Sequence, residues 1–250
     1  MRKFLLATCG IPASGKTTLA RAIVEALAGT VRAQIVSTDD LRSQQYYEDF
    51  RPEREHAVRA DALRRTEHLL QRGLSVIHDD TNYYASMRHE LLSLANRYHA
   101  IFAVVHVATP LETALRWNEE RRGPIPPQVL QRIAQRIDIP GERYRWDRPL
   151  AVVDLSQVDV QRAAEHIASE LIRVDRSAGR TADTRTITGQ RAANVDILTR
   201  RAVTEYLRAH PQLRGSPEIS RIRREVLRAG LQHAMTDEEV LKLLREKLPR

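Results

Sequence analysis

Short apolar runs along the chain alternate with longer stretches in which apolar residues recur at helical spacing. The short runs are typical of buried strands, which we predict over 3–9, 33–37, 74–78, 100–107 and 150–154. Helical spacing predicts helices over 52–72, 86–98, 110–122, 128–137 and 159–173, with another between Leu19 and Gly29. Because strands that alternate with helices are joined by right-handed crossovers, the pattern predicts an α/β domain with a five-stranded, mainly parallel sheet.

The pattern changes after the last of these helices. Residues 176–190 are rich in Thr, Arg, Gly and Ser and have no apolar period, which is typical of a linker. Three short helices are predicted beyond it, over 194–209, 217–233 and 237–248, and Thr236-Asp237-Glu238-Glu239 resembles a helix start. We therefore expect an α/β domain over 1–173, a linker over 174–192 and a small all-α domain over 193–250.

Charge is distributed unevenly along the chain, whose net charge is +8. Residues 1–173 carry 24 basic and 22 acidic side chains, whereas residues 174–250 carry 16 and 10. A basic C-terminal part indicates a polyanionic partner, and nucleic acid is the usual one. A composition that simply favours arginine is the alternative, because the chain has only four lysines: Lys3, Lys16, Lys242 and Lys247.

The cysteine count and the length of the apolar runs bear on the cellular location of the protein. The single cysteine, Cys9, excludes an internal disulfide and fits a reducing cytoplasm. The apolar run Phe4–Thr8 is too short for a signal peptide, and no stretch approaches the roughly 20 apolar residues of a membrane span. We expect a cytoplasmic protein without membrane contact, and the sequence is compatible with a homodimer.

A glycine-rich motif follows the first predicted strand: Gly10-Ile11-Pro12-Ala13-Ser14-Gly15-Lys16-Thr17. It matches the phosphate-binding P-loop in both spacing and context, because an amphipathic helix comes next. Backbone N–H groups of such a loop bind phosphate at the helix N-terminus, while the lysine contacts the β- and γ-phosphates and the threonine hydroxyl binds Mg²⁺. These residues predict an ATP site, and Thr18 is counted with them although a structural role suits it as well.

Acidic residues follow the second and third predicted strands. Asp39 can accept a proton from an attacking hydroxyl, with Arg42 beside the acceptor, although Asp39 or Asp40 could instead cap the next helix. Asp79 and Asp80 end a strand where Mg²⁺ is often held, and the pattern alone does not rank them. We predict Thr17, Asp80 and Asp39 as the metal ligands and Asp39 as the catalytic base.

A basic helix follows the fourth predicted strand. Arg116 and Arg121 on it could close over the triphosphate as a lid and neutralise charge during phosphate transfer. A solvated basic helix face is an equally simple explanation for these arginines. On the first interpretation, Arg121 is catalytic and Arg116 contacts the nucleotide.

Several segments together resemble one family, the archaeal L-seryl-tRNA(Sec) kinases, also called O-phosphoseryl-tRNA(Sec) kinases. The resemblance covers the predicted P-loop kinase domain and is densest over Asp79–Tyr84 with Ser86-Met87-Arg88. It extends to Asn118–Arg121, Pro140-Gly141 and Tyr144–Asp147. One departure concerns the lid, because Trp117 stands where this family has the first of two lid arginines. We expect Ser86 to cap the helix that it begins.

The resemblance implies ATP- and Mg²⁺-dependent phosphorylation of the serine carried by tRNA(Sec), for selenocysteine synthesis. It implies that Asp39 is the base, that Arg42 lies beside it at the acceptor, and that Lys16 and Thr17 bind the nucleotide. With Arg121 of the lid, we predict Asp39, Lys16 and Arg42 as the catalytic residues. The resemblance also implies that the acceptor pocket contains Tyr83, Tyr84 and Met87 together with Arg42, and that the C-terminal helices bind the tRNA. The residues alone leave two alternatives open. One is a polynucleotide 5′-hydroxyl kinase, and the other is an RNA-binding nucleotide switch with little catalysis.

Overall fold

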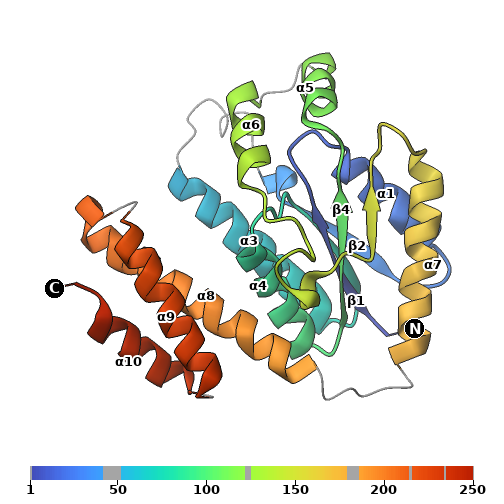
Figure 1. The fold of residues 1–250 in the computed structure, drawn as a ribbon. Coiled ribbons are helices and arrows are strands. Elements are labelled where there is room, and N and C mark those ends of the chain that lie inside the picture. Colours follow the sequence, from blue (N-terminus) through green and yellow to red (C-terminus); the bar gives the residue numbers. More distant parts are fainter. Residues whose placement is uncertain are drawn as a thin grey trace. The chain divides into compact units, whose positions relative to one another are not determined.

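The computed structural model describes residues 2–41, 52–121, 125–178, 186–213, 216–233 and 235–249. The chain divides into two compact units, a larger unit over Met1–Ala182 and a smaller unit over Asp183–Arg250 (Figure 1). Each unit encloses its own apolar core, so we describe each one by itself.

The larger unit is built on a parallel sheet whose strand order is β2-β3-β1-β4-β5. Its strands are β1 (Phe4–Cys9), β2 (Ala33–Ser37), β3 (Ser75–Asp79), β4 (Ile101–Val107) and β5 (Ala151–Val153). Every neighbouring pair is parallel, and the central strand β1 is buried along its whole length. The predicted α/β class with five parallel strands is therefore confirmed.

Helices cover both faces of this sheet. The helices that contribute to the apolar clusters on the two faces are α1 (Lys16–Ala26), α3 (Pro52–Gln71), α4 (Ala85–Arg97) and α7 (Val160–Ala178). The unit also contains α5 (Leu111–Glu120) and α6 (Pro127–Arg136), which pack against each other, and the 3-10 helices η1 (Asp39–Leu41) and η2 (Arg145–Asp147). Phe4 and Leu6 of β1 belong to the cluster that includes α1 and α7, whereas Leu5 and Ala7 belong to the cluster that includes α3 and α4 (Figure 1). Alternate side chains of β1 thus supply both cores, which explains its continuous apolar sequence.

Strand register brings the carboxyl ends of β1, β2 and β3 to one edge of the sheet. Ala7 pairs with His78, and Ser37 pairs with Asp79. The P-loop follows β1, Asp39 follows β2, and Asp80 follows β3. In an open parallel sheet the ligand site lies outside these carboxyl ends, so the fold gathers the predicted site residues there.

The start of α4 differs from the prediction. The helix begins at Ala85 and its N-cap residue is Tyr84, so the assignment of Ser86 as the cap was wrong. The free backbone N–H of Ala85 donates to Asp138 Oδ2 at 3.1 Å. A carboxylate distant in the sequence therefore satisfies this helix end, and local sequence gives no sign of it.

The smaller unit contains α8 (Thr186–Ala209), α9 (Pro217–Gln232) and α10 (Asp237–Lys247), with the 3-10 helix η3 (Pro211–Leu213). A Cβ on Gly230 would lie 2.9 Å from Val240 Cγ2 and 3.3 Å from Val195 Cγ1, so this glycine allows the helices to pack closely. The predicted start of the last helix is confirmed. Thr236 and Glu239 form a reciprocal capping box there, with the Thr236 backbone N–H donating to Glu239 Oε2 at 2.6 Å.

The segment predicted as a linker is partly helical. α7 continues to Ala178 and α8 begins at Thr186, while 179–185 lie outside the described residues. The division of function between the two parts of the chain stays a prediction. Among the helices that the structure describes, none has both the length and the apolar character needed to cross a bilayer.

Candidate active site

The P-loop joins the end of β1 to the start of α1, as its sequence context predicted. The N–H of Gly10 donates to the Thr81 carbonyl at 3.0 Å, and a Cβ on Gly10 would lie 2.5 Å from the Val107 carbonyl oxygen. Gly15 is the N-cap of α1 and has a backbone φ of 94°, a value that residues other than glycine rarely adopt. Both glycines are therefore required by the backbone, and α1 presents its N-terminus to the site.

Lys16 is almost fully buried, with 8% of its surface exposed. Its Nζ donates to the Ile11 carbonyl of the same loop at 2.6 Å. Burial lowers the pKa of Lys16, while the charges of Asp79, Asp39 and Asp80 act in the opposite direction. The ammonium group is thus held against the loop, where phosphate oxygens could replace the carbonyl as its partner.

Asp79, the last residue of β3, is hydrogen-bonded to the P-loop. Its Oδ2 accepts from Thr17 Oγ1 at 2.7 Å and from Ser37 Oγ at 3.3 Å. Burial raises the pKa of Asp79, an effect opposed by the Thr17 hydrogen bond and by the charge of Lys16. Thr17 and Asp79 together provide the oxygen ligands that Mg²⁺ prefers.

Asp80 has a different environment. Its Oδ1 accepts from Thr38 Oγ1 at 3.0 Å and from the N–H of Thr81 at 2.7 Å, so it organises the turn after β3. Asp79 is thus the aspartate hydrogen-bonded to Thr17, whereas Asp80 bonds to Thr38 and Thr81, and the prediction of Asp80 as a metal ligand stays a prediction. No group of three or more His, Cys, Asp or Glu side chains suited to a metal occurs among the described residues. A magnesium ion bound largely through phosphates and water does not need one.

Asp39 lies on η1, directly after β2, and is exposed. Its backbone N–H donates to Ser37 Oγ at 3.3 Å, which ties the start of η1 to the strand. The carboxylate is close enough to Lys16 to raise the pKa of that lysine, against the larger lowering caused by burial. Its position is compatible with the predicted base, whereas Arg42 lies outside the described residues.

Tyr83 and Tyr84 follow the Asp80 turn and are both half-buried. Their ring centroids are 4.1 Å apart, with an interplanar angle of 41°. Burial and the neighbouring Tyr84 raise the pKa of Tyr83 to about 12, so its hydroxyl is protonated at neutral pH. Met87 is buried, and its predicted place in the acceptor pocket stays a prediction.

The predicted lid arginines are exposed. Arg116 on α5 has its Nε 3.8 Å from Glu120 Oε1, and Arg121 forms the C-cap of the same helix.

Sequence reasoning assigned no role to two other side chains that reach the P-loop. A Cβ on Gly15 would lie 2.7 Å from Leu155 Cδ1 and 3.7 Å from the Trp117 ring. The lid alignment singled out Trp117, whereas no local signal marks Leu155.

The family model described as chromatin associated protein KTI12 matches residues 4–243. The L-seryl-tRNA(Sec) kinase of Methanococcus maripaludis is 30% identical over 159 residues, which are 61% of this chain and 60% of that protein. Protein KTI12 of Saccharomyces cerevisiae is 25% identical over 178 residues, covering 68% and 57% of the two chains. The chain therefore spans about three fifths of the length of these relatives.

Solved structures agree with the fold. Kti12 of Chaetomium thermophilum in complex with ADP-AlF3 has a TM-score of 0.53 and 25% identity, covering 69% of this chain and 97% of that chain. A gluconokinase from Sinorhizobium meliloti, at 16% identity and a TM-score of 0.54, covers 73% of this chain and 100% of that chain and supports the fold alone. The predicted resemblance to the seryl-tRNA(Sec) kinases is confirmed, and the chain is a kinase-like protein with a nucleotide-binding P-loop fold. Because the family model covers residues 4–243, the chain belongs to the KTI12 family.

Proposed function

We propose that this protein binds Mg-ATP and transfers the γ-phosphate to the serine of seryl-tRNA(Sec). The observation that carries the proposal is the 2.7 Å hydrogen bond between Thr17 and Asp79, with Lys16 buried beside it. A hydroxyl, a carboxylate and an ammonium group converge at the N-terminus of α1, as phosphate transfer to an acceptor requires. The 30% identity to an archaeal L-seryl-tRNA(Sec) kinase supports the choice of acceptor.

In this proposal the P-loop amides and Lys16 bind the triphosphate. Thr17 and Asp79 would hold Mg²⁺, which would supply neutralisation of the charge on the β- and γ-phosphates. Asp39 accepts the proton of the serine hydroxyl, because a neutral hydroxyl is a poor nucleophile. Arg42 and Arg121 stabilise the transferring phosphate.

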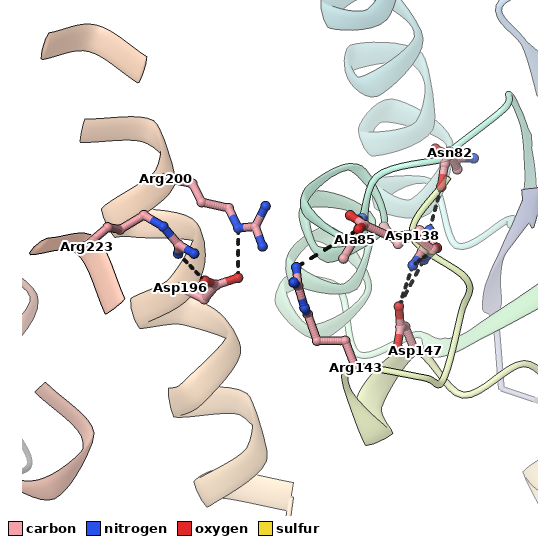
Figure 2. Close-up of polar contacts among 9 residues, drawn as sticks. Asn82, Ala85, Asp138, Arg143, Asp147, Asp196, Arg200 and Arg223 are labelled. Carbon is pink, nitrogen blue, oxygen red and sulfur yellow. Dashed lines mark hydrogen bonds and ion pairs between the residues drawn. The ribbon is translucent and has the colours of Figure 1, made fainter. Parts of the chain in front are cut away.

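The smaller unit is proposed to bind the tRNA body. Buried Asp196 on α8 pairs with Arg200 of the same helix and with Arg223 of α9, so the Arg223 ion pair joins the two helices (Figure 2). Arg208 and Arg228 are exposed on α8 and α9. Phosphate contacts by such side chains make binding salt-dependent.

The acceptor is tested with γ-labelled ATP, seryl-tRNA(Sec) and uncharged tRNA(Sec). We expect label only on the charged tRNA, and mild alkali should then release it as phosphoserine. Label that stays on the RNA after deacylation, or that appears on a 5′-hydroxyl RNA, would favour a polynucleotide kinase.

A nucleotide-driven switch is the second candidate, and membership in the KTI12 family favours it. Such a protein would turn over ATP in the presence of tRNA without leaving phosphate on serine or RNA. The same labelling experiment separates the two functions, because free phosphate would then be the only labelled product.

The tRNA contact is tested by salt dependence. Arg228→Gln should weaken binding of tRNA and lower the slope of log affinity against log salt by about one unit. Arg21→Gln is the matched control, since Arg21 is an equally exposed arginine on α1 of the larger unit. Equal effects of the two substitutions would refute a specific role for the smaller unit.

A further inference from the structure

Arg88 of α4 carries a guanidinium group that is completely buried. Its Nε and Nη2 donate to Asp147 Oδ2 at 3.0 and 2.7 Å. Nη1 donates to the Asn82 carbonyl at 2.8 Å and Nη2 to the Asp138 carbonyl at 2.9 Å, and all three partners appear in Figure 2. Nη1 also lies 3.6 Å from Cys9 Sγ. Since a guanidinium has five N–H donors, the whole hydrogen-bonding capacity of Arg88 is used.

The partners of Arg88 come from separate segments. Asn82 lies in the turn after β3, Asp138 follows α6, and Asp147 ends η2. Asp147 Oδ1 accepts in addition from the N–H of Gly141 at 3.1 Å. A buried ion pair is often no more stabilising than apolar residues of similar volume, so stability alone is a weak explanation for this one.

The same network reaches the tyrosine pair. The N–H of Asp138 donates to the Tyr83 carbonyl at 2.8 Å, and Asp138 Oδ2 accepts from the N–H of Ala85 at 3.1 Å. Arg143 Nη1 lies 4.0 Å from Asp138 Oδ1 on the outer side of this contact (Figure 2). Residues 82–85 are therefore held by Arg88 at Asn82 and by Asp138 at Tyr83 and Ala85.

The network also reaches the P-loop. Asn82 Nδ2 donates to the carbonyl of Thr8 at 2.8 Å, near the end of β1. The neighbouring Thr81 carbonyl accepts from the N–H of Gly10 at 3.0 Å. Asn82 has a φ of 41°, which is uncommon for a residue other than glycine, and the surrounding bonds hold it there. Continuous hydrogen bonds thus run from the P-loop to Tyr83.

We propose that Arg88 is a positioning residue that sets the tyrosine pair relative to the P-loop through Asn82 and Asp138. This inference rests on the proposed function, which places the acceptor at Tyr83 and Tyr84. Arg88 itself is completely buried, so in this proposal it acts through Asn82 and Asp138. Because phosphate transfer requires an aligned acceptor, a shift of about 1 Å in this segment costs about 100-fold in rate.

The decisive variant is Arg88→Lys, which keeps the charge opposite Asp147 but loses the planar fork of donors. We expect kcat/KM for seryl-tRNA to fall about 10- to 100-fold, with ATP affinity unchanged. Arg97→Lys is the matched control, because Arg97 is on the same helix but its side chain is 62% exposed and pairs with Glu67. The control should retain wild-type kinetics.

Cys9 supplies a second readout that needs no acceptor. It is the only cysteine, is fully buried and contacts Arg88. Labelling of native protein with N-ethylmaleimide should be about tenfold faster in Arg88→Lys than in Arg97→Lys, because local opening exposes the thiol. If Arg88→Lys does not fold, Asp138→Ala tests the same network, since it removes the carboxylate contacts with Ala85 and Arg143 but keeps the backbone bonds to Arg88 and Tyr83. Its kcat/KM for seryl-tRNA should fall about tenfold, again with ATP affinity unchanged.

The outcomes separate the two proposals. Wild-type acceptor kinetics in the folded variant, or an equal loss of ATP affinity, would overturn the positioning role. If the wild-type protein phosphorylates no seryl-tRNA, the proposed function fails, and Cys9 labelling still tests the network. Faster labelling in Arg88→Lys alone supports the proposed linkage to the P-loop, whereas equal labelling in both variants refutes it.

Discussion

Lys16 and Asp79 are buried beside the P-loop, whereas Asp39, Arg116 and Arg121 are exposed. The buried pair has its geometry imposed by the sheet and by hydrogen bonds to Ile11 and Thr17. Of the exposed groups, Asp39 lies on a 3-10 helix, Arg121 caps the end of α5 and Arg116 lies within α5, and solvent competes for all three. On the proposed function, this difference means that the phosphate site is organised before ligand binds, while Asp39, Arg116 and Arg121 are to be aligned by the substrates.

The contrast between the buried and the exposed groups of the site is tested most severely by Lys16→Ala. We expect phosphate transfer to fall about 10³-fold, because a preorganised cation in a buried site contributes strongly to stabilising transferred charge. Product assays measure the loss, and circular dichroism checks the fold. Lys3→Ala is the control, since it alters the other lysine of the larger unit. Near-normal turnover in a folded Lys16→Ala protein would contradict the P-loop assignment.

Asp39→Asn tests the role of an exposed group of the site. We expect kcat to fall about 100-fold while tRNA binding is kept, because general-base catalysis is lost without a change in contact surface. Asp40→Asn is the neighbouring control and should be mild. The reverse order would identify Asp40 as the base, and two mild variants would mean that both residues only begin η1.

Asp79→Asn compared with Asp80→Asn tests which of the two aspartates supports Mg²⁺ beside Thr17. The apparent Mg²⁺ affinity should fall about 10- to 100-fold in Asp79→Asn, because a carboxylate that orients metal-bound ligands is lost. Asp80→Asn should change it less, since Asp80 bonds to Thr38 and Thr81. Turnover measured against Mg²⁺ concentration distinguishes them, and a larger defect in Asp80→Asn would support the prediction of Asp80 as a metal ligand.

Arg116→Ala and Arg121→Ala each should lower kcat about tenfold, the equivalent of one charge-assisted hydrogen bond. Single-turnover measurements separate this effect from product release. Arg162→Ala on α7 is an exposed control. A double Arg116/Arg121 variant with wild-type kinetics would show that this face of α5 is merely solvated.

Trp117→Ala has the smallest expected effect. Nucleotide affinity should fall about fivefold if the ring stacks on the base, and Trp117→Phe should preserve it. In a Trp146→Phe background Trp117 is the only tryptophan, so its fluorescence should be quenched by ATP. An unchanged signal at saturating ATP would exclude contact between the indole and the nucleotide.

The P-loop motif and the pattern of apolar residues predicted a large part of the fold. The apolar runs located all five strands of the sheet, and the spacing of Gly10, Gly15, Lys16 and Thr17 located the P-loop between β1 and α1. These features are local, because strand burial and loop geometry each depend on residues close together in the chain. The sequence pattern did not rank Asp79 and Asp80, since adjacent residues at a strand end have different partners and those partners lie far away in the chain.

What the sequence determined by itself was the parallel α/β fold, the P-loop and the acidic residues at the ends of β2 and β3. Periodicity and backbone requirements encode these features over short windows. Tertiary structure alone decided that Asp79 joins Thr17, that Leu155 reaches Gly15 and that Arg88 meets Asp147. Those partners are far apart in the chain. From the sequence alone, a charged residue such as Arg88 is predicted to be exposed, because its buried hydrogen-bond acceptors are not yet known.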